Sequence, residues 1–143
     1  MWKASLLLLV GLTACHSSGD MGDMSDSIDD VRLEINRHAE ASQAAPTIEY
    51  MRQELTRHRY EMMPILDDVD HSMSSMSSHC DGTGLTDMLA MHDAMHDELG
   101  RHLTSMDKGM ELPAAKMEVE RYAAAMRFTM DGMFGSMGSM NCH

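Results

Sequence analysis

Apolar residues recur every three or four positions along four stretches of the chain, the spacing expected where one face of a helix is buried. These stretches are 28–38, 48–76, 85–106 and 119–140. No segment alternates apolar and polar residues between hairpin turns, so the sequence predicts no strands. The pattern therefore predicts an all-α protein, an antiparallel four-helix bundle.

Proline and glycine mark the predicted helix ends. Pro46 opens the second helix, residues 82–84 separate it from the third, and Gly109 and Pro113 bracket the last connection. Pro64 lies inside the second helix, where it removes a backbone donor and is expected to kink the helix.

The second half of the chain repeats the first. A shift of 64 residues superposes the Arg-His pair at 37–38 on the pair at 101–102. Further matches are Glu54 with Glu118, Arg57 with Arg121, Met62 with Met126, Asp67 with Asp131, Met73 with Met137, Met76 with Met140 and His79 with His143. The bundle, residues 27–143, is therefore predicted to be a duplicated helical hairpin with repeats 27–80 and 85–143.

Each predicted helix carries one motif: Glu, an aliphatic residue, any residue, Arg, then His or Tyr. It occurs at 34–38, 54–58, 98–102 and 118–122. The aliphatic residue and the His or Tyr fall on the buried face, and the Arg is expected to point outward. Antiparallel pairing then predicts that Glu34 faces His58, Glu54 faces His38, Glu98 faces Tyr122 and Glu118 faces His102.

This polar layer has two interpretations. The opposed carboxylates can simply supply partners for buried histidines and set the helix register. Alternatively, His38, His58 and His102 converge with the four glutamates on a metal, an arrangement loosely similar to ferritin-like di-metal bundles. The layer departs from that pattern because its Glu and His are four apart rather than three, and because the fourth histidine is missing.

Methionine and histidine are unusually frequent, with 19 Met and 9 His among 143 residues. Thioether and imidazole ligands favour Cu(I) or Ag(I), and the composition resembles that of periplasmic copper-binding and silver-binding proteins. The candidate ligands outside the polar layer are Met91, His92, Met95, His96, Met73, Met76, His79, Met137, Met140 and His143. Six methionines are expected to pack in the core, and one of them, Met95, is also a candidate ligand. They are Met51, Met62, Met88, Met95, Met106 and Met126. Glycines at 132, 135 and 138 predict that the tail from Met130 to Met140 is flexible rather than packed.

The N-terminus reads as an export signal. Lys3 precedes an apolar run from Ala4 to Leu12, which is too short to span a bilayer. The run ends in Leu-Thr-Ala-Cys at 12–15, which resembles the lipobox of bacterial lipoproteins. That resemblance implies cleavage after residue 14, lipidation of Cys15 and attachment to a membrane of the cell envelope on its periplasmic side, with the outer membrane favoured. Residues 15–26 are expected to form a flexible tether.

Export places the other two cysteines, Cys80 and Cys142, in an oxidising compartment, which favours a disulfide over two thiolate metal ligands. The formal net charge of -12 argues against a nucleic-acid partner. No haem-attachment motif, nucleophile elbow or phosphate-binding loop is present, so no reaction is indicated. The sequence thus predicts a non-enzymatic, lipid-anchored protein that binds copper or silver. The alternatives are an iron or manganese di-metal bundle and a purely structural lipoprotein.

Overall fold

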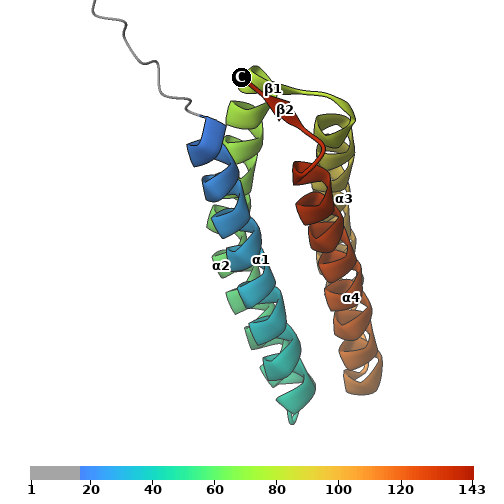
Figure 1. The fold of residues 1–143 in the computed structure, drawn as a ribbon. Helices are drawn as coiled ribbons and strands as arrows, with labels where there is room; N and C mark the ends of the chain where they lie inside the picture. The colour runs from blue at the N-terminus through green and yellow to red at the C-terminus, as the bar shows by residue number, and fades with distance from the viewer. Residues whose placement is uncertain (1–16) are drawn as a thin grey trace, which may run out of the picture.

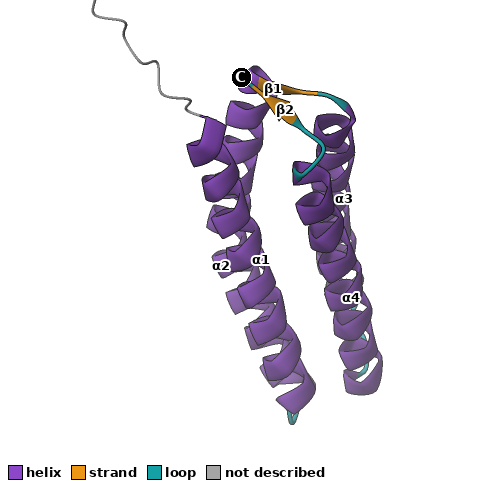
Figure 2. Ribbon diagram, in the orientation of Figure 1, coloured by secondary structure: helices purple, strands orange, loops and turns teal. Residues whose placement is uncertain are grey.

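Four α-helices form the part of the chain, residues 17–143, that the computed structural model describes (Figure 1). They are α1 (Ser17–Ala44), α2 (Ile48–His79), α3 (Thr83–Asp107) and α4 (Leu112–Met137), with two short strands, β1 (Cys80–Asp81) and β2 (Asn141–Cys142). Figure 2 shows that most of the described chain is helical. The predicted all-α four-helix bundle is confirmed.

The helices pair as two hairpins, α1 with α2 and α3 with α4, and the hairpins join mainly where α1 contacts α4. Contacts between α2 and α3 are sparse. Buried apolar side chains form two clusters. The larger includes Ile28, Met76 and Met133, towards the end that holds the strands, and the smaller includes Met51 and Val119, towards the opposite end. The polar layer lies between them.

Local sequence explains the helix ends. The Thr47 hydroxyl accepts a hydrogen bond from the backbone N–H of Tyr50, which caps α2 after the turn at Pro46. Helix α2 continues through Pro64 to His79. Gly82 precedes α3 with φ of 96°, a conformation that glycine adopts without strain.

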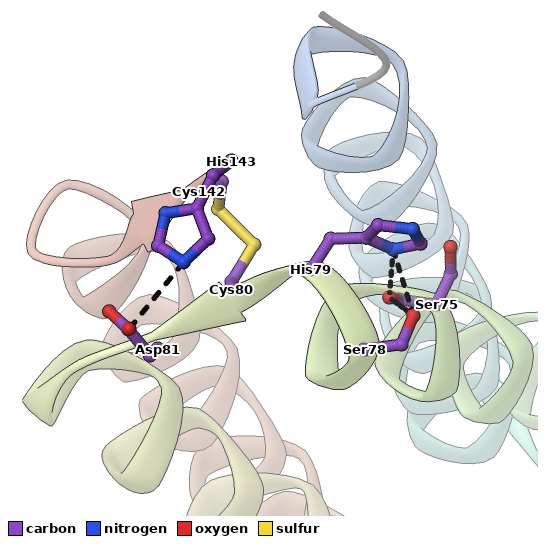
Figure 3. Close-up of a disulfide and its surroundings, with 7 residues drawn as sticks. All are labelled: Ser75, Ser78, His79, Cys80, Asp81, Cys142 and His143. Atoms are coloured by element: carbon purple, nitrogen blue, oxygen red, sulfur yellow. Dashed lines mark hydrogen bonds and ion pairs between the residues drawn. A yellow bond between two sulfur atoms is a disulfide. The ribbon is translucent and has the colours of Figure 1, made fainter.

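A disulfide lies at one end of the bundle. The turns that join α1 to α2 and α3 to α4 lie at the opposite end. Cys80 pairs with Cys142 in the antiparallel β1–β2 bridge, and their sulfur atoms are bonded (Figure 3). This is the pairing favoured from the sequence. It ties the end of α2 to the segment that follows α4.

The segment predicted to be a tether is a helix from Ser17 onward, so the predicted boundary at residue 26 is wrong. Met24 is fully buried and Met21 packs against the core. The 3–4 spacing of Ile28 and Val31 therefore extends back to these methionines, and their burial stabilises two extra helical turns. Cys15 and the predicted signal segment lie outside the described residues.

The prediction of a flexible C-terminal tail is also wrong. Helix α4 reaches Met137, and Met130 and Met133 are fully buried. One of the glycines that suggested flexibility, Gly132, instead lies where a Cβ would collide with the Met91 side chain of α3. On α3, a Cβ at Gly84 would collide with the Ser136 backbone carbonyl, so both glycines allow the two helices to approach closely. All six methionines predicted as core are buried.

Within residues 17–143, none of the helices combines the length and the apolar character that crossing a membrane requires.

Candidate functional site

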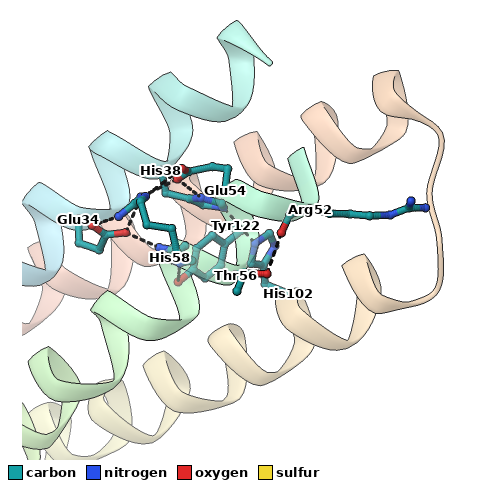
Figure 4. Close-up of polar contacts among 9 residues, drawn as sticks. Glu34, His38, Arg52, Glu54, Thr56, His58, His102 and Tyr122 are labelled. Atoms are coloured by element: carbon teal, nitrogen blue, oxygen red, sulfur yellow. Dashed lines mark hydrogen bonds and ion pairs between the residues drawn. The ribbon is translucent and has the colours of Figure 1, made fainter. Parts of the chain in front are cut away.

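The polar layer forms with the predicted register. His38 Nδ1 donates to Glu54 at 3.0 Å, and His58 Nδ1 donates to Glu34 at 2.7 Å (Figure 4). In the second hairpin His102 Nδ1 lies 3.3 Å from Glu118. All three imidazoles are fully buried. Three of the four predicted pairs are therefore confirmed, and each joins one imidazole nitrogen to a carboxylate.

The fourth predicted pair is not formed. The Tyr122 hydroxyl lies 3.1 Å from His58 Nε2 rather than bonding to Glu98. His58 Nδ1 carries the hydrogen of the hydrogen bond to Glu34. Its Nε2 is therefore an acceptor, and the Tyr122 hydroxyl is the donor. The Tyr122 hydroxyl thus contacts the opposite hairpin, as the Nε2 atom of His102 also does.

Two arginines cover the carboxylates, contrary to the expectation that they point outward. Arg57 donates to Glu34 at 2.9 Å through two nitrogens, and it also binds Glu54. Arg121 bridges Glu98 and Glu118 in the same way, at 2.6 and 2.5 Å. Each guanidinium is thus shared by the two glutamates of its hairpin, because attraction to two nearby negative charges outweighs full hydration of a partly exposed cation.

The remaining arginines of the motif behave differently. Arg101 binds Glu98 but its side chain is 53% exposed, and Arg37 is exposed at the surface. Sequence reasoning missed the distinction because all four arginines follow a glutamate by three positions. Only the arginines on the second helix of each hairpin reach both carboxylates.

Charge pairing keeps the carboxylates ionised. Burial opposes ionisation of Glu34, but hydrogen bonds from His58 and Arg57 outweigh it and hold its pKa below the usual value. Hydrogen bonds from Arg121 are the largest cause of the lowered pKa of Glu118. Conversely, the hydrogen bond to Glu54 raises the pKa of Arg57. Glu34 and Glu118 are therefore acceptors, and the Nδ1 atoms of His58 and His102 that face them carry hydrogen.

The four rings fill the centre of the bundle in two stacks. His38 stacks on His58 with ring centroids 3.9 Å apart, and His102 stacks on Tyr122 at 4.0 Å. The stacks meet in a T-shaped arrangement, with the His38 and His102 ring centroids 5.5 Å apart and an interplanar angle of 72°. The layer is thus a closed group of three imidazoles and one phenol.

At the centre, His38 Nε2 and His102 Nε2 lie 3.4 Å apart. Both imidazoles already donate from Nδ1 to a carboxylate, so in the neutral form both Nε2 atoms are acceptors. Two acceptors cannot satisfy one another, and a buried acceptor without a donor costs about 1–3 kcal/mol. The geometry therefore presents two converging lone pairs in a dry interior.

A proton is not the favoured occupant of this gap. Burial is the main cause that lowers the pKa of His38 to about 2, with further lowering by His58 and His102. Burial also lowers the pKa of His102 to about 4, although Glu118 opposes this. Near neutral pH both rings are uncharged.

A second cluster lies near the surface between α2 and α3. His92 Nε2 and His96 Nε2 lie 2.6 and 2.8 Å from the same oxygen of Asp70. Burial opposes ionisation of Asp70, but the hydrogen bonds from both histidines outweigh it and lower its pKa. The sequence identified the two histidines by their spacing of four. It did not identify Asp70, because nothing in the sequence near Asp70 shows which residue on α2 faces them.

The other predicted ligands do not form one group. Met73, Met76 and Met95 are buried in the apolar core, and Met91, Met137 and Met140 are partly buried against it. At the disulfide end, His79 Nδ1 lies 3.0 Å from the Ser75 carbonyl, and His143 Nε2 lies 3.6 Å from Asp81 (Figure 3). Their imidazoles point to separate partners although the His143 N–H donates to the His79 carbonyl.

Comparison of this chain with protein families, curated proteins and solved structures found no match. The chemistry of the site is therefore argued from its own residues.

Proposed function

We propose that this is an exported, lipid-anchored protein that binds a soft monovalent metal, Cu(I) or its analogue Ag(I), between His38 and His102. One observation carries the proposal: the Nε2 atoms of two buried imidazoles lie 3.4 Å apart, and with hydrogen on both Nδ1 atoms their lone pairs face each other. Metal–imidazole bonds of about 2.0 Å place the two nitrogen ligands of a linear ion about 4 Å apart, so the rings would separate by about 0.6 Å when the ion binds. Soft monovalent ions such as Cu(I) and Ag(I) accept coordination by only two ligands.

The surroundings suit metal-bound imidazoles. Metal-ligating histidines ordinarily donate their other N–H to a carboxylate, which fixes the ring and raises its basicity. Glu54 and Glu118 occupy these positions for His38 and His102. Arg57 and Arg121 in turn form ion pairs with the glutamates. Each arginine is shared by two glutamates, so negative charge remains to offset an entering cation.

The apolar side chains around the imidazoles favour a metal ion of low charge. Met62 and Met126 are fully buried, one helical turn from His58 and Tyr122. A monovalent ion loses less hydration energy than a divalent one in such an interior, and thioethers are compatible with Cu(I). Met91, Met137 and Met140, which are only partly buried, are the proposed thioethers for initial capture.

The carboxylates make the di-metal alternative less suitable. Each glutamate is engaged by arginine or histidine, and the oxygens lie at the Nδ1 side of the rings, away from the facing Nε2 atoms. A bridging carboxylate centre would require these ion pairs to break.

Two features support the proposal that the protein is exported. The segment at 12–15 resembles a lipobox, and a disulfide such as Cys80–Cys142 persists in an oxidising compartment. A lipid-anchored metal binder of this kind would buffer, deliver or sequester the metal outside the cytoplasm. No catalytic step is proposed.

Titration of the purified protein with Ag(I), and with Cu(I) under anaerobic conditions against a chromophoric chelator, tests the proposal. The expected result is one site lost in both His38→Leu and His102→Leu and retained in His71→Ala, an exposed histidine. Nitrogen NMR of the unsubstituted protein gives a second measurement: Ag(I) should shift Nε2 of His38 and His102 and leave their Nδ1 atoms protonated. Unchanged Nε2 resonances at saturating Ag(I) would overturn the proposal.

A further inference from the structure

We infer that Asp70, His92 and His96 form a second, separate site, which binds a borderline divalent cation such as Zn²⁺ or Cu²⁺. One ligand atom from each residue lies within 4.8 Å of the others. The histidines are one turn apart on α3, and the aspartate comes from the facing helix α2. The side chains are partly exposed, at 46% for Asp70, 17% for His92 and 39% for His96, so an ion can enter from solvent.

The donor set indicates the class of metal. Two imidazole nitrogens and one carboxylate oxygen match the ligands of Zn²⁺ and Cu²⁺, whereas Mg²⁺ and Ca²⁺ prefer oxygen alone. The three described donors leave at least one coordination position for water. The site therefore differs in both charge and ligand type from the facing imidazoles in the core.

Binding needs only a local rearrangement. In the structure His92 and His96 both bond to one oxygen of Asp70 through Nε2. A metal at the convergence point displaces the hydrogens from Nε2, and each neutral imidazole then carries its one N–H hydrogen on Nδ1 instead. The carboxylate of Asp93 lies 3.6 Å from His92 Nδ1, where it can orient this hydrogen as a partner of the ligand.

The site lies between two helices that contact each other sparsely. Helices α2 and α3 make few contacts, and the three ligands span them. Asp70 is twelve residues beyond His58, about 18 Å along α2 at the helical rise of 1.5 Å per residue. A divalent ion there would join the two hairpins and leave the core layer unchanged. Binding should accordingly raise the melting temperature.

Calorimetric titration with Zn²⁺, and the visible spectrum of the Co²⁺ form, test this inference. The Asp70→Asn and His96→Ala variants should each bind Zn²⁺ at least about tenfold more weakly and lose the Zn²⁺-dependent rise in melting temperature. Asp67→Asn and His71→Ala are matched controls, since both residues are exposed and lie within three positions of Asp70. They should bind Zn²⁺ as the unsubstituted protein does.

Equal Zn²⁺ affinity in Asp70→Asn, His96→Ala and the controls would overturn the inference. So would loss of Zn²⁺ binding in His102→Leu but not in Asp70→Asn. Neither result bears on Ag(I) binding at the core pair, because that pair is tested by different ligands and different variants. The two proposals therefore fail independently.

Discussion

His38 and His102 face each other through Nε2 atoms 3.4 Å apart, and they are the same residue in the two repeats. Their separation of 64 positions is the offset of the duplication, and the hydrogen-bonded pair of His58 and Tyr122 has the same separation. Equivalent residues of two similar hairpins meet where an approximate two-fold axis passes between them. The centre of the polar layer is therefore a consequence of the duplication.

Acid should destabilise the metal-free protein. The folded state holds His38 and His102 neutral, with pKa values of about 2 and about 4, whereas the same imidazoles titrate near 6.5 in the unfolded chain. Between these values the unfolded chain binds more protons, so stability falls as pH falls. At pH 5 each imidazole should lower the free energy of unfolding by about 2 kcal/mol relative to pH 8.

Urea unfolding at pH 8, 7, 6 and 5 measures this dependence. In the His38→Gln/His102→Gln double variant, the free energy of unfolding should change much less between pH 8 and pH 5, whatever its absolute value. A stability that stays constant or rises between pH 8 and 5 in the unsubstituted protein would contradict the assignment of neutral, buried imidazoles.

Removing Arg57 should cost about 3 kcal/mol, because Arg57→Gln leaves two buried carboxylates without their shared cation. Its side chain is 23% exposed, and it binds both Glu34 and Glu54. Arg37→Gln is the matched control, since Arg37 occupies the same motif position but is exposed. That change should alter stability by less than about 0.5 kcal/mol, as measured by chemical denaturation. Similar losses in both variants would refute the bridging role.

The Tyr122 hydroxyl should contribute measurably to stability. Tyr122→Phe leaves His58 Nε2 without its donor at 3.1 Å, and we expect a loss of about 1–3 kcal/mol. Tyr60→Phe serves as the control because Tyr60 is 78% exposed. Tyr122→Phe should also shift the Nε2 nitrogen resonance of His58. A neutral effect on both stability and resonance would rule out this hydrogen bond.

Reduction of the disulfide should lower the melting temperature by more than about 10 °C. Cys80 and Cys142 are 62 residues apart, and closing a loop of that length stabilises the folded state by about 4 kcal/mol in the chain-entropy model. The Cys80→Ser/Cys142→Ser variant should melt at the reduced temperature with or without reductant. If reductant left the melting temperature of the unsubstituted protein unchanged, the bridge would have no stabilising role.

Periodicity and duplication were sufficient to predict the helices, their antiparallel pairing and three of the four acid–imidazole contacts. These features depend on spacing along one helix or within one hairpin, where a short turn sets the register. The pairing of Glu34 with His58 is such a case. Burial of the methionines from Met51 to Met126 that were predicted as core followed from the same 3–4 spacing.

Only the tertiary structure decided the contacts between hairpins and the direction of long side chains. Spacing along the chain does not contain the rotation of one hairpin against the other, so it could not reveal that His102 meets His38 or that Asp70 meets His92 and His96. Arg57 turns inward because two carboxylates attract it. Gly84 and Gly132 lie where a Cβ would collide with the facing helix, which lets α3 and α4 pack closely. Such outcomes depend on packing in three dimensions, whereas periodicity records only which face of each helix is apolar.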